Sequence, residues 1–549
     1  METPRFILLI ALGLVLTMIW QSWEEDYGNT FQTNTETLTQ EPLTEVVDLP
    51  EAPRVNIDNE SAPIITDASD KQTQSGTVVH VKTDLLDVEI NTLGATIQHL
   101  ELLAYPISKK QTDEKVVLLD HDNNYYYLVQ GGLLSKDGGA NHKTLFSSEK
   151  NNYVLGDKES IVVPFFYETD NGLKITKTVT FYKGQYVADI NYKIQNSTSE
   201  NWSGSAYGQI NRTEPKENGS RLIYTYTGAI ISTPEKRYEK ISFDDIQDDK
   251  LSVDVSNGWV AMLQHYFITA LIPGSKEDQY HYYTLNPENK SYVIGVITPS
   301  KLIAAGASEN MNHRVYIGPK LQKQLEEVAE GLNLTVDYGI FWFLAKPLYW
   351  VLDYIHGYVN NWGWSIILVT LFLKLCFYKL SAAGYRSMAN MRRVQPRLLS
   401  IKERYKDDRA RLNQAMMDIY KEEKINPLGG CFPILVQIPV FISLYWVLLE
   451  SVELRQADFI LWINDLSIPD PYFVLPLLMG ITMFVQQKLN PAPMDPVQAK
   501  VMSVLPVVFT VFFAFFPSGL VLYWVVNNTL SIAQQWMITR NLERASSNK

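Results

Sequence analysis

Five long apolar runs lie between residues 361 and 538 of this 549-residue chain, and none of them contains an aspartate or a glutamate. Each run is close to the ~20 residues that a helix needs to cross a bilayer. We therefore predict an α-helical transmembrane bundle. A proline and a glycine in "FPSG" mark a turn between the last two runs. The predicted spans are 361–383, 428–449, 472–489, 498–516 and 518–538.

The first half of the chain has a different character. From Glu24 to Asp337 it holds 27 lysines and arginines against 45 acids, whereas from Tyr338 onward it holds 20 against 14. Between 76 and about 320, short runs alternate apolar and polar residues, as in "YVADINYKIQ", which is typical of strands with one buried face. A turn at Lys183-Gly184 pairs that run with "KITKTVTFY". We expect an all-β sandwich domain over 76–337, closed by a helix at 319–331.

Three further segments complete the predicted domain order. Residues 1–23 carry Arg5 before an apolar run, with acids and no A-x-A-like cleavage site after it, which favours an uncleaved signal-anchor span. Residues 24–75 are polar and low in aromatics, as expected of a flexible linker. Residues 338–360 are aromatic but too polar to span comfortably, so we predict an amphipathic helix in the membrane interface.

Charge sets the predicted orientation. The segment 384–427 holds eleven basic and six acidic residues, whereas the loop 450–471 holds one arginine and five acids. The positive-inside rule then places 384–427, a predicted helical hairpin, in the cytoplasm, together with both termini and the tail 541–549. The β-domain lies outside. The basic face of the hairpin fits either anionic lipid or a translating ribosome, whose RNA attracts the same charges.

Lys374 lies deep in the first of the five runs, where a cation costs about 2.5–3.5 kcal/mol even on the lenient insertion scale. At 100° per residue it shares a polar stripe with Thr370, Tyr378 and Ser381, while Lys379 faces the opposite side. Gln437 lies at a similar depth in the next span, and Asn527 and Asn528 lie in the last. Polar groups at membrane depth face a bundle interior or a water-filled cavity. We predict that these residues line a wet groove open to the cytoplasm.

Each of these residues also has a structural interpretation. Gln437 alone is more simply explained as interhelical hydrogen bonding. An ion pair for Lys374 is disfavoured, because no span offers a carboxylate. The same absence of carboxylates argues against a proton-coupled transporter and suits a transient anionic guest.

The chain has no HExxH, CxxC or P-loop pattern, and its two cysteines, Cys376 and Cys431, both lie in the apolar half. We expect no disulfide framework, cofactor, metal or catalytic residue.

Several segments carry a family resemblance: "NPLGGCFPILVQIPVF" (426–441), "SVELRQADFILWINDLS" (451–467), "LPLLMGITMFVQQK" (475–488) and "FPSGLVLYWVVNN" (516–528). The chain resembles the YidC family of bacterial membrane protein insertases, in its long Gram-negative form. The resemblance implies a periplasmic super-sandwich and an insertase core over 361–540. It also implies insertion and folding of inner-membrane proteins, alone or with the Sec translocon and its accessory subunits, without a nucleotide.

The resemblance also implies roles for single residues. By position, Lys374 matches the family's groove arginine, Gln437 and Thr370 match its polar neighbours, and Tyr523 and Trp524 match an aromatic pair that contacts nascent substrate. Lysine is a point charge without the guanidinium fork, so charge rather than bidentate geometry is the expected role. Two alternatives remain open from the residues alone. One is a small-anion transporter or channel, and the other is a sensor with an outer ligand-binding sandwich.

Overall fold

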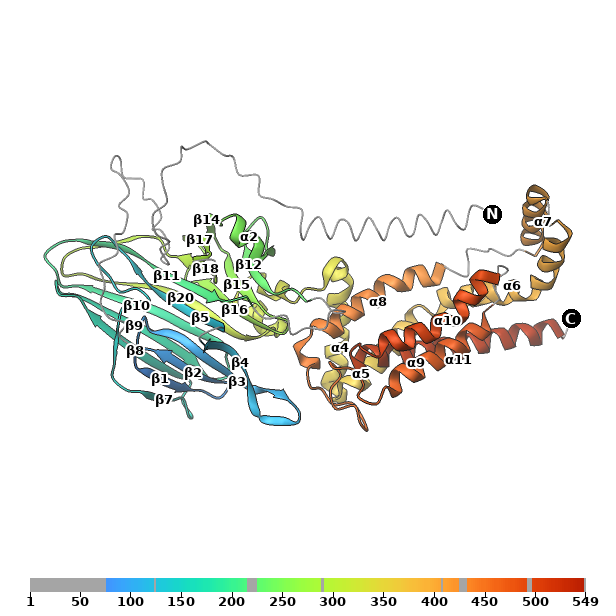
Figure 1. Ribbon diagram of the computed structural model, residues 1–549, viewed down its shortest axis with the longest axis horizontal. Coiled ribbons are helices and arrows are strands. Elements are labelled where there is room, and N and C mark those ends of the chain that lie inside the picture. The colour runs from blue at the N-terminus through green and yellow to red at the C-terminus, as the bar shows by residue number, and fades with distance from the viewer. Residues whose placement is uncertain are drawn as a thin grey trace. The chain divides into compact units, whose positions relative to one another are not determined.

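The computed structural model describes residues 76–122, 125–214, 225–287, 291–405, 408–423, 432–490 and 496–547. The chain divides into two compact units, and the boundary along the sequence falls between Val336 and Asp337. Strands dominate the described part of the first unit, and helices dominate that of the second (Figure 1). The expected anchor at 1–23 and linker at 24–75 lie outside the described residues.

Two sheets form the first unit. The described part of the first sheet has eleven strands: β1 (Val78–Lys82), β2 (Leu86–Asn91), β3 (Thr96–Ser108), β4 (Gln111–Asp122), β5 (Tyr125–Leu134), β7 (Asn152–Val154), β11 (Trp202–Arg212), β14 (Ser252–Ser256), β17 (Gln279–Leu285), β18 (Tyr292–Ile297) and β19 (Lys301–Ile303). The described part of the second has nine: β6 (Ser147–Ser148), β8 (Ser160–Glu168), β9 (Leu173–Tyr182), β10 (Val187–Asn196), β12 (Gly228–Ser232), β13 (Glu239–Ile241), β15 (Trp259–Leu263), β16 (Phe267–Pro273) and β20 (Ser308–Pro319). Their spatial orders are β14-β17-β18-β11-β5-β4-β3-β2-β1-β7, with β19 beside β11, and β13-β12-β15-β16-β20-β10-β9-β8-β6.

The pairing of β9 with β10 shows why this sequence folds into a sandwich. The two strands pair antiparallel, with Ile190 opposite Val179, around the predicted turn, where Gly184 has a φ of 70°. Along β10, Ile190, Tyr192 and Ile194 are buried, and the residues between them are partly or fully exposed. This period of two puts one face of the sheet in the core. The predicted all-β sandwich is confirmed, and the short helices α2 (Phe243–Asp248) and α3 (Gln322–Val328) accompany it.

The second unit is helical. Its described helices are α4 (Trp342–Val359), α5 (Trp362–Cys376), α6 (Tyr378–Arg404), α7 (Arg409–Glu422), α8 (Phe432–Glu450), α9 (Val474–Leu489), α10 (Pro496–Phe513) and α11 (Ser518–Ser547). Helix α11 packs mainly against α9, α5 and α6, and α4 packs against α5 and α8. Helices α6 and α7 share a small apolar core of Val394, Leu398 and Ile419.

The predicted span at 361–383 does not run as one straight helix, because the chain bends by 69° between α5 and α6, at Phe377. No proline or glycine marks this break in the sequence. A bend frees backbone groups that neighbouring side chains must satisfy, and here Gln534 of α11 donates to the carbonyl of Tyr378 at 3.2 Å. Judged by length and composition, no single described helix suffices to cross a membrane, whereas the bent α5–α6 pair does.

A polar cluster lies inside the β-sandwich. Lys177 of β9 is fully buried, and its Nζ donates to the carbonyls of Gly94 and Ala95 at 2.9 and 3.0 Å. His313 of β20 stacks on the ring of Tyr192, with centroids 6.2 Å apart. Burial, reinforced by the positive charge of Lys177, lowers the pKa of His313 to about 3. His313 is therefore neutral in the folded protein at any pH near 7.

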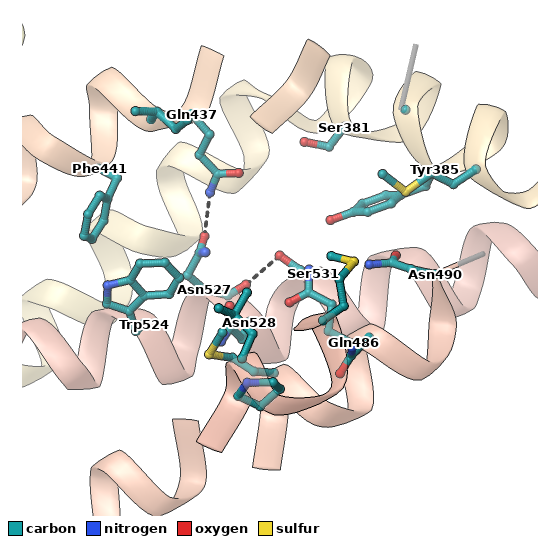
Figure 2. Close-up of a pocket in the computed structure, with 18 of the residues that line it drawn as sticks. Ser381, Tyr385, Gln437, Phe441, Gln486, Asn490, Trp524, Asn527, Asn528 and Ser531 are labelled. Carbon is teal, nitrogen blue, oxygen red and sulfur yellow. Dashed lines mark hydrogen bonds between the residues drawn. The ribbon is translucent and has the colours of Figure 1, made fainter. Parts of the chain in front are cut away.

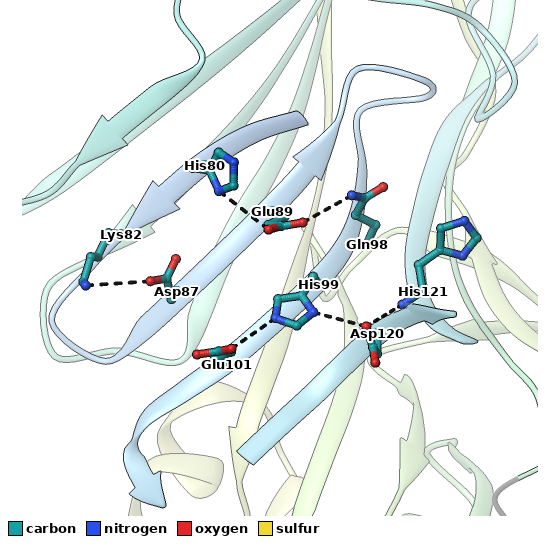
Figure 3. Close-up of polar contacts among 9 residues, drawn as sticks. All are labelled: His80, Lys82, Asp87, Glu89, Gln98, His99, Glu101, Asp120 and His121. Atoms are coloured by element: carbon teal, nitrogen blue, oxygen red, sulfur yellow. Dashed lines mark hydrogen bonds and ion pairs between the residues drawn. The ribbon is translucent and has the colours of Figure 1, made fainter. Parts of the chain in front are cut away.

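A second histidine sits on the outer face of the same unit, in a very different environment (Figure 3). The two ring nitrogens of His99 face carboxylates, with Nδ1 3.2 Å from Asp120 and Nε2 3.4 Å from Glu101. Glu89, its cross-strand partner on β2, adds further negative charge. Partial burial alone would lower the pKa of His99, but these hydrogen bonds and charges outweigh burial and raise it above 6.5.

The buried histidine predicts acid sensitivity. The pKa of His313 is about 3 in the folded state against an ordinary value of 6.5, so the unfolded chain binds the extra proton between these values. The free energy of unfolding should therefore fall as the pH is lowered from 6.5 towards 3, by at most about 5 kcal/mol at 1.36 kcal/mol per pKa unit. Urea unfolding of a fragment covering residues 33–336 measures this. His313→Phe should make the free energy of unfolding depend less on pH below 6.5 than it does in the surface control His121→Gln. An unchanged pH dependence would contradict the lowered pKa of His313.

For the outer histidine, His99, we predict that stability changes with pH in the opposite direction. Because its folded pKa is raised, the stabilisation from protonated His99 is fully present below pH 6.5 and is lost as the pH rises through the raised value. His99→Gln should destabilise the same fragment more at pH 5.5 than at pH 8.5, again measured by urea unfolding. Equal losses at both pH values would show that the ring does not act through its charge. His121→Gln serves as the control, because its ring lies away from the cluster (Figure 3).

Candidate functional site

Helix α11 carries polar side chains on consecutive turns, and they contact several different neighbours. Asn527 accepts a bond of 2.8 Å from Gln437 of α8, and Ser531 accepts one of 2.7 Å from Lys374 of α5. Gln534 reaches the α5–α6 bend, as described above. Two further contacts extend the same set to α9 and the residue after it: Asn528 to Thr482 at 3.3 Å, and Gln535 to Asn490 at 3.0 Å. We call Asn527, Asn528, Ser531, Gln534 and Gln535 the α11 polar ladder.

Lys374 is held by a neutral partner. Its Nζ donates to Ser531 Oγ, and that hydroxyl donates in turn to the backbone oxygen of Asn527 at 2.7 Å. Thr370, one turn earlier, is 1% exposed and bonds the carbonyl of Ile366 within its own helix. Within the described ranges, no carboxylate forms an ion pair with Lys374. The cation therefore keeps its charge uncompensated inside the bundle.

Two pockets adjoin this contact. A small pocket of about 20 Å³ is lined by Lys374 and Thr370, and a large pocket of about 310 Å³ lies among α6, α8, α9, α10 and α11 (Figure 2). The hydrogen-bonded pair of Gln437 and Asn527 lines both pockets. This amide pair therefore stands at the boundary between them.

Aromatic rings form part of the wall. Phe441 of α8 lies 6.0 Å from Tyr523 and 4.8 Å from Trp524 between ring centroids, and Phe513 of α10 lies 5.6 Å from Trp524. Tyr523 lines both pockets, whereas Trp524 lines only the large one. These ring contacts join α8, α10 and α11. Phe441 and Trp524 lie on the side of the large pocket opposite Asn490 (Figure 2).

The structure brings most of the predicted groove residues together. Ser381, Gln437, Tyr523 and Asn527 line both pockets. Lys374 and Thr370 line the small pocket alone, and Asn528 and Trp524 the large pocket alone. Tyr378 lines neither pocket and is 47% exposed. It follows the bend at Phe377, so a helical wheel that assumes a straight helix misplaces its side chain.

Several lining residues were not anticipated. They are Tyr385 and Met388 of α6, Phe441 of α8, Met483, Gln486, Gln487 and Asn490 of or beside α9, and Met502 of α10. The one available signal was the pair Gln486-Gln487 at the end of an apolar run, which reads equally well as the polar end of a span. Methionines carry no such signal, because they are ordinary in apolar helices.

The site holds no metal cluster. Across the described residues, no group of three or more histidine, cysteine, aspartate or glutamate side chains is placed to bind a metal ion. What the arrangement offers is one cation, many amides and hydroxyls, and an aromatic wall. Chemically, these groups can bind and solvate a polar guest.

Comparison with known proteins identifies the family. Residues 78–351 match the family model for the YidC periplasmic domain, and residues 354–545 match that for the 60Kd inner membrane protein. The Membrane protein insertase YidC of Nitrosococcus oceani is 48% identical over 99% of this chain and 100% of its own. The chain belongs to the YidC family of membrane protein insertases. The YidC of Methylococcus capsulatus is also 48% identical, over 99% of each chain.

The YidC family also includes a solved structure that aligns with this one. It is an active YidC insertase with its first transmembrane domain resolved, and it covers 84% of this chain and 94% of its own at 16% identity, with a TM-score of 0.38. Family membership rests on the sequence matches, which extend over both units. The YidC family matches therefore make the β-sandwich a periplasmic domain and the helical unit part of an inner-membrane protein.

The amide pair at the pocket boundary predicts a measurable coupling. Asn527→Leu leaves the Gln437 amide without this acceptor. The substitution should lower the free energy of unfolding by about 1 kcal/mol, because an interhelical hydrogen bond in a membrane contributes less than that on average, whereas an unpaired amide costs somewhat more. The double variant with Gln437→Leu should lose less than the sum of the singles, because no amide is then left unpaired. Thermal unfolding in detergent measures this, with the exposed Thr529→Leu as control. Strict additivity would contradict the bond.

Proposed function

We propose that this protein inserts and helps fold integral membrane proteins at the bacterial inner membrane, and that the two pockets beside the α11 polar ladder receive the polar parts of its substrates. Family membership supports insertion as the activity. The observation that carries the site assignment is Lys374, a cation inside the bundle whose bonding partner is a hydroxyl and not a carboxylate. Intramembrane charges are functional by default, and this one is available to a guest.

The proposed topology has six spans with both termini in the cytoplasm. The anchor at 1–23 and the five runs between 361 and 538 supply the spans, and the five form the insertase core. Helix α4 lies in the outer interface, which its exposed aromatic residues Trp342, Trp350 and Tyr354 support. The hairpin of α6 and α7 lies in the cytoplasm, which the excess of basic residues in 384–427 supports.

The proposed mechanism uses solvation and burial. The acidic or polar flank of a nascent segment enters from the cytoplasm, and Lys374 with its polar neighbours replaces part of the hydration that the flank loses. The inside-negative potential helps an acidic flank outward, by about 2.3 kcal/mol per charge per 100 mV. The hydrophobic segment meets the aromatic wall of Tyr523 and Trp524 and then passes sideways into lipid. No covalent bond changes, so the activity needs no catalytic residue.

The proposed partners are nascent membrane proteins, the Sec translocon with its accessory subunits, the translating ribosome and membrane lipid. For the ribosome and for anionic lipid, the relevant surface is the α6–α7 hairpin. Glu423 pairs with Arg393 at 3.1 Å and Arg397 at 2.9 Å, and Asp408 pairs with Arg411 at 3.3 Å, so at least three of the hairpin's eleven basic residues also form ion pairs within it. Contact with RNA or lipid therefore depends mainly on the other basic residues.

Charge at position 374 provides the decisive experiment. In cells depleted of the native insertase, Lys374→Arg should support insertion of an acidic-tailed substrate, whereas Lys374→Ala should reduce it severalfold and Lys374→Glu should abolish it. Protease protection of the translocated tail measures insertion. Lys379→Ala is the matched control, because Lys379 lines neither pocket. Equal insertion with all three substitutions would sink the proposed role.

An experiment in liposomes distinguishes the insertase from the alternative of a small-anion transporter or channel. Purified protein should insert a hydrophobic substrate protein from outside the vesicle without dissipating a chloride gradient. Anion flux that depends on Lys374, with no insertion, would favour the channel. Deletion of residues 76–320 tests the sensor alternative, since an insertase should keep most activity without its β-domain.

A further inference from the structure

The large pocket differs from the small one in charge: a lysine lines the small pocket, and no charged residue lines the large one. Each of the nineteen described residues that line the large pocket is uncharged, although one of them, Ser531, bonds directly to the partly buried cation Lys374. Lys374 lines only the small pocket. Two features stand between the charge and the large pocket: Ser531, which accepts the lysine's hydrogen bond, and the amide pair of Gln437 and Asn527.

The polar part of the large pocket consists mainly of amides. They are Gln437, Gln486, Gln487, Asn490, Asn527 and Asn528. An amide both donates and accepts, so it can bond hydroxyl, amide and backbone groups of either polarity. Gln486 and Gln487 make no side-chain hydrogen bond with another described residue, whereas Asn490 already accepts from Gln535. The first two are thus the amides most available to a guest.

The apolar part of the wall is adaptable. Met388, Met483 and Met502 enter it from three different helices, α6, α9 and α10. Methionine is unbranched and polarizable, so it accommodates side chains of varied shape. Such a wall accommodates guest side chains of different shapes. The amides then favour the guests whose polar groups they can hydrogen-bond.

Size and charge define that class. A volume of about 310 Å³ equals about ten waters at ~30 Å³ each, which is room for a few side chains on one face of a helix. A carboxylate or ammonium placed there would lose hydration and meet no charged group among the lining residues, which is unfavourable. Serine, threonine, asparagine and glutamine would exchange water for amide bonds at little cost.

We propose that the large pocket receives the uncharged polar face of a substrate's transmembrane helix, and that Gln486 and Gln487 set this preference, while Lys374 serves charged flanks separately. This inference rests on the insertase function proposed above and names the substrate class of one part of its site. The two pockets then divide the polar groups of a nascent chain by charge, with the Gln437–Asn527 pair as the boundary.

The test uses two single-span reporters in depleted cells. The first has a neutral tail and a leucine-based helix with serine and asparagine on one face; the second has an acidic tail and a wholly apolar helix. The double variant Gln486→Leu/Gln487→Leu should reduce insertion of the first severalfold and leave the second unchanged. Lys374→Ala should do the reverse. Thr529→Leu, on the exposed side of α11, is the control for a polar-to-leucine change.

A gain-of-function variant covers the case in which the double variant folds poorly. Gln486→Arg places a cation in the large pocket and should raise insertion of a third reporter, whose helix face carries one aspartate, above the wild-type level. A photo-crosslinking amino acid at position 486 should capture the polar-faced helix more strongly than the apolar one. No gain with Gln486→Arg, together with equal crosslinking of both helices, overturns the inference.

The outcomes also separate this inference from the proposed function. If Lys374→Ala impairs the acidic-tailed reporter and both helices crosslink equally at position 486, the insertase function stands and the division by charge fails. If no reporter crosslinks at position 486 and none depends on Lys374, the site assignment fails, and this inference fails with it.

Discussion

The α11 polar ladder is the constraint on which the helical unit depends. Apolar helix faces give little specific attraction inside a bilayer, because lipid tails are as apolar as leucine, so hydrogen bonds and close packing determine how helices meet. Asn527, Ser531 and Gln534 bond to α8, α5 and α6 in turn. Three features depend on bonds to this one helix: the position of Lys374, the bend at Phe377 and the amide pair between the pockets.

The same ladder explains which parts of the site could be predicted from the sequence. Lys374, Gln437 and Asn527 stand out because each is a polar residue in an apolar run, and a span of known length fixes their depth. The bend at Phe377 has no local signal, since it is held by Gln534, which lies 156 residues away from Tyr378 along the chain. For that reason the wheel placed Thr370 correctly beside Lys374 but misplaced Tyr378. Gln486 and the methionines become site residues only through the packing of α6, α9 and α10.

The β-domain was predictable for a different reason. A period of two in hydrophobicity states directly which face of a strand is buried, and the β9–β10 pairing follows from the short turn at Lys183–Gly184. The alternation even assigns Lys177 to the buried face, although a lysine is a poor core residue on composition alone. The sequence does not show what it bonds to there. Likewise, nothing local distinguishes His99 from His313, because carboxylates from β3 and β4 surround one and the sandwich core the other.

The contact of Lys374 with Ser531 has a consequence for how long a guest stays. The bond from the Lys374 ammonium to Ser531 already has one charged partner, and such bonds contribute about 1.5–3 kcal/mol. An acidic guest that enters as proposed must displace this bond, so its net gain is smaller than the free energy of its own bond to Lys374. A built-in glutamate would block entry, and a bare lysine would retain its guest. On the proposed mechanism, this competition from Ser531 shortens the stay of each guest, so that one pocket can serve many chains in succession.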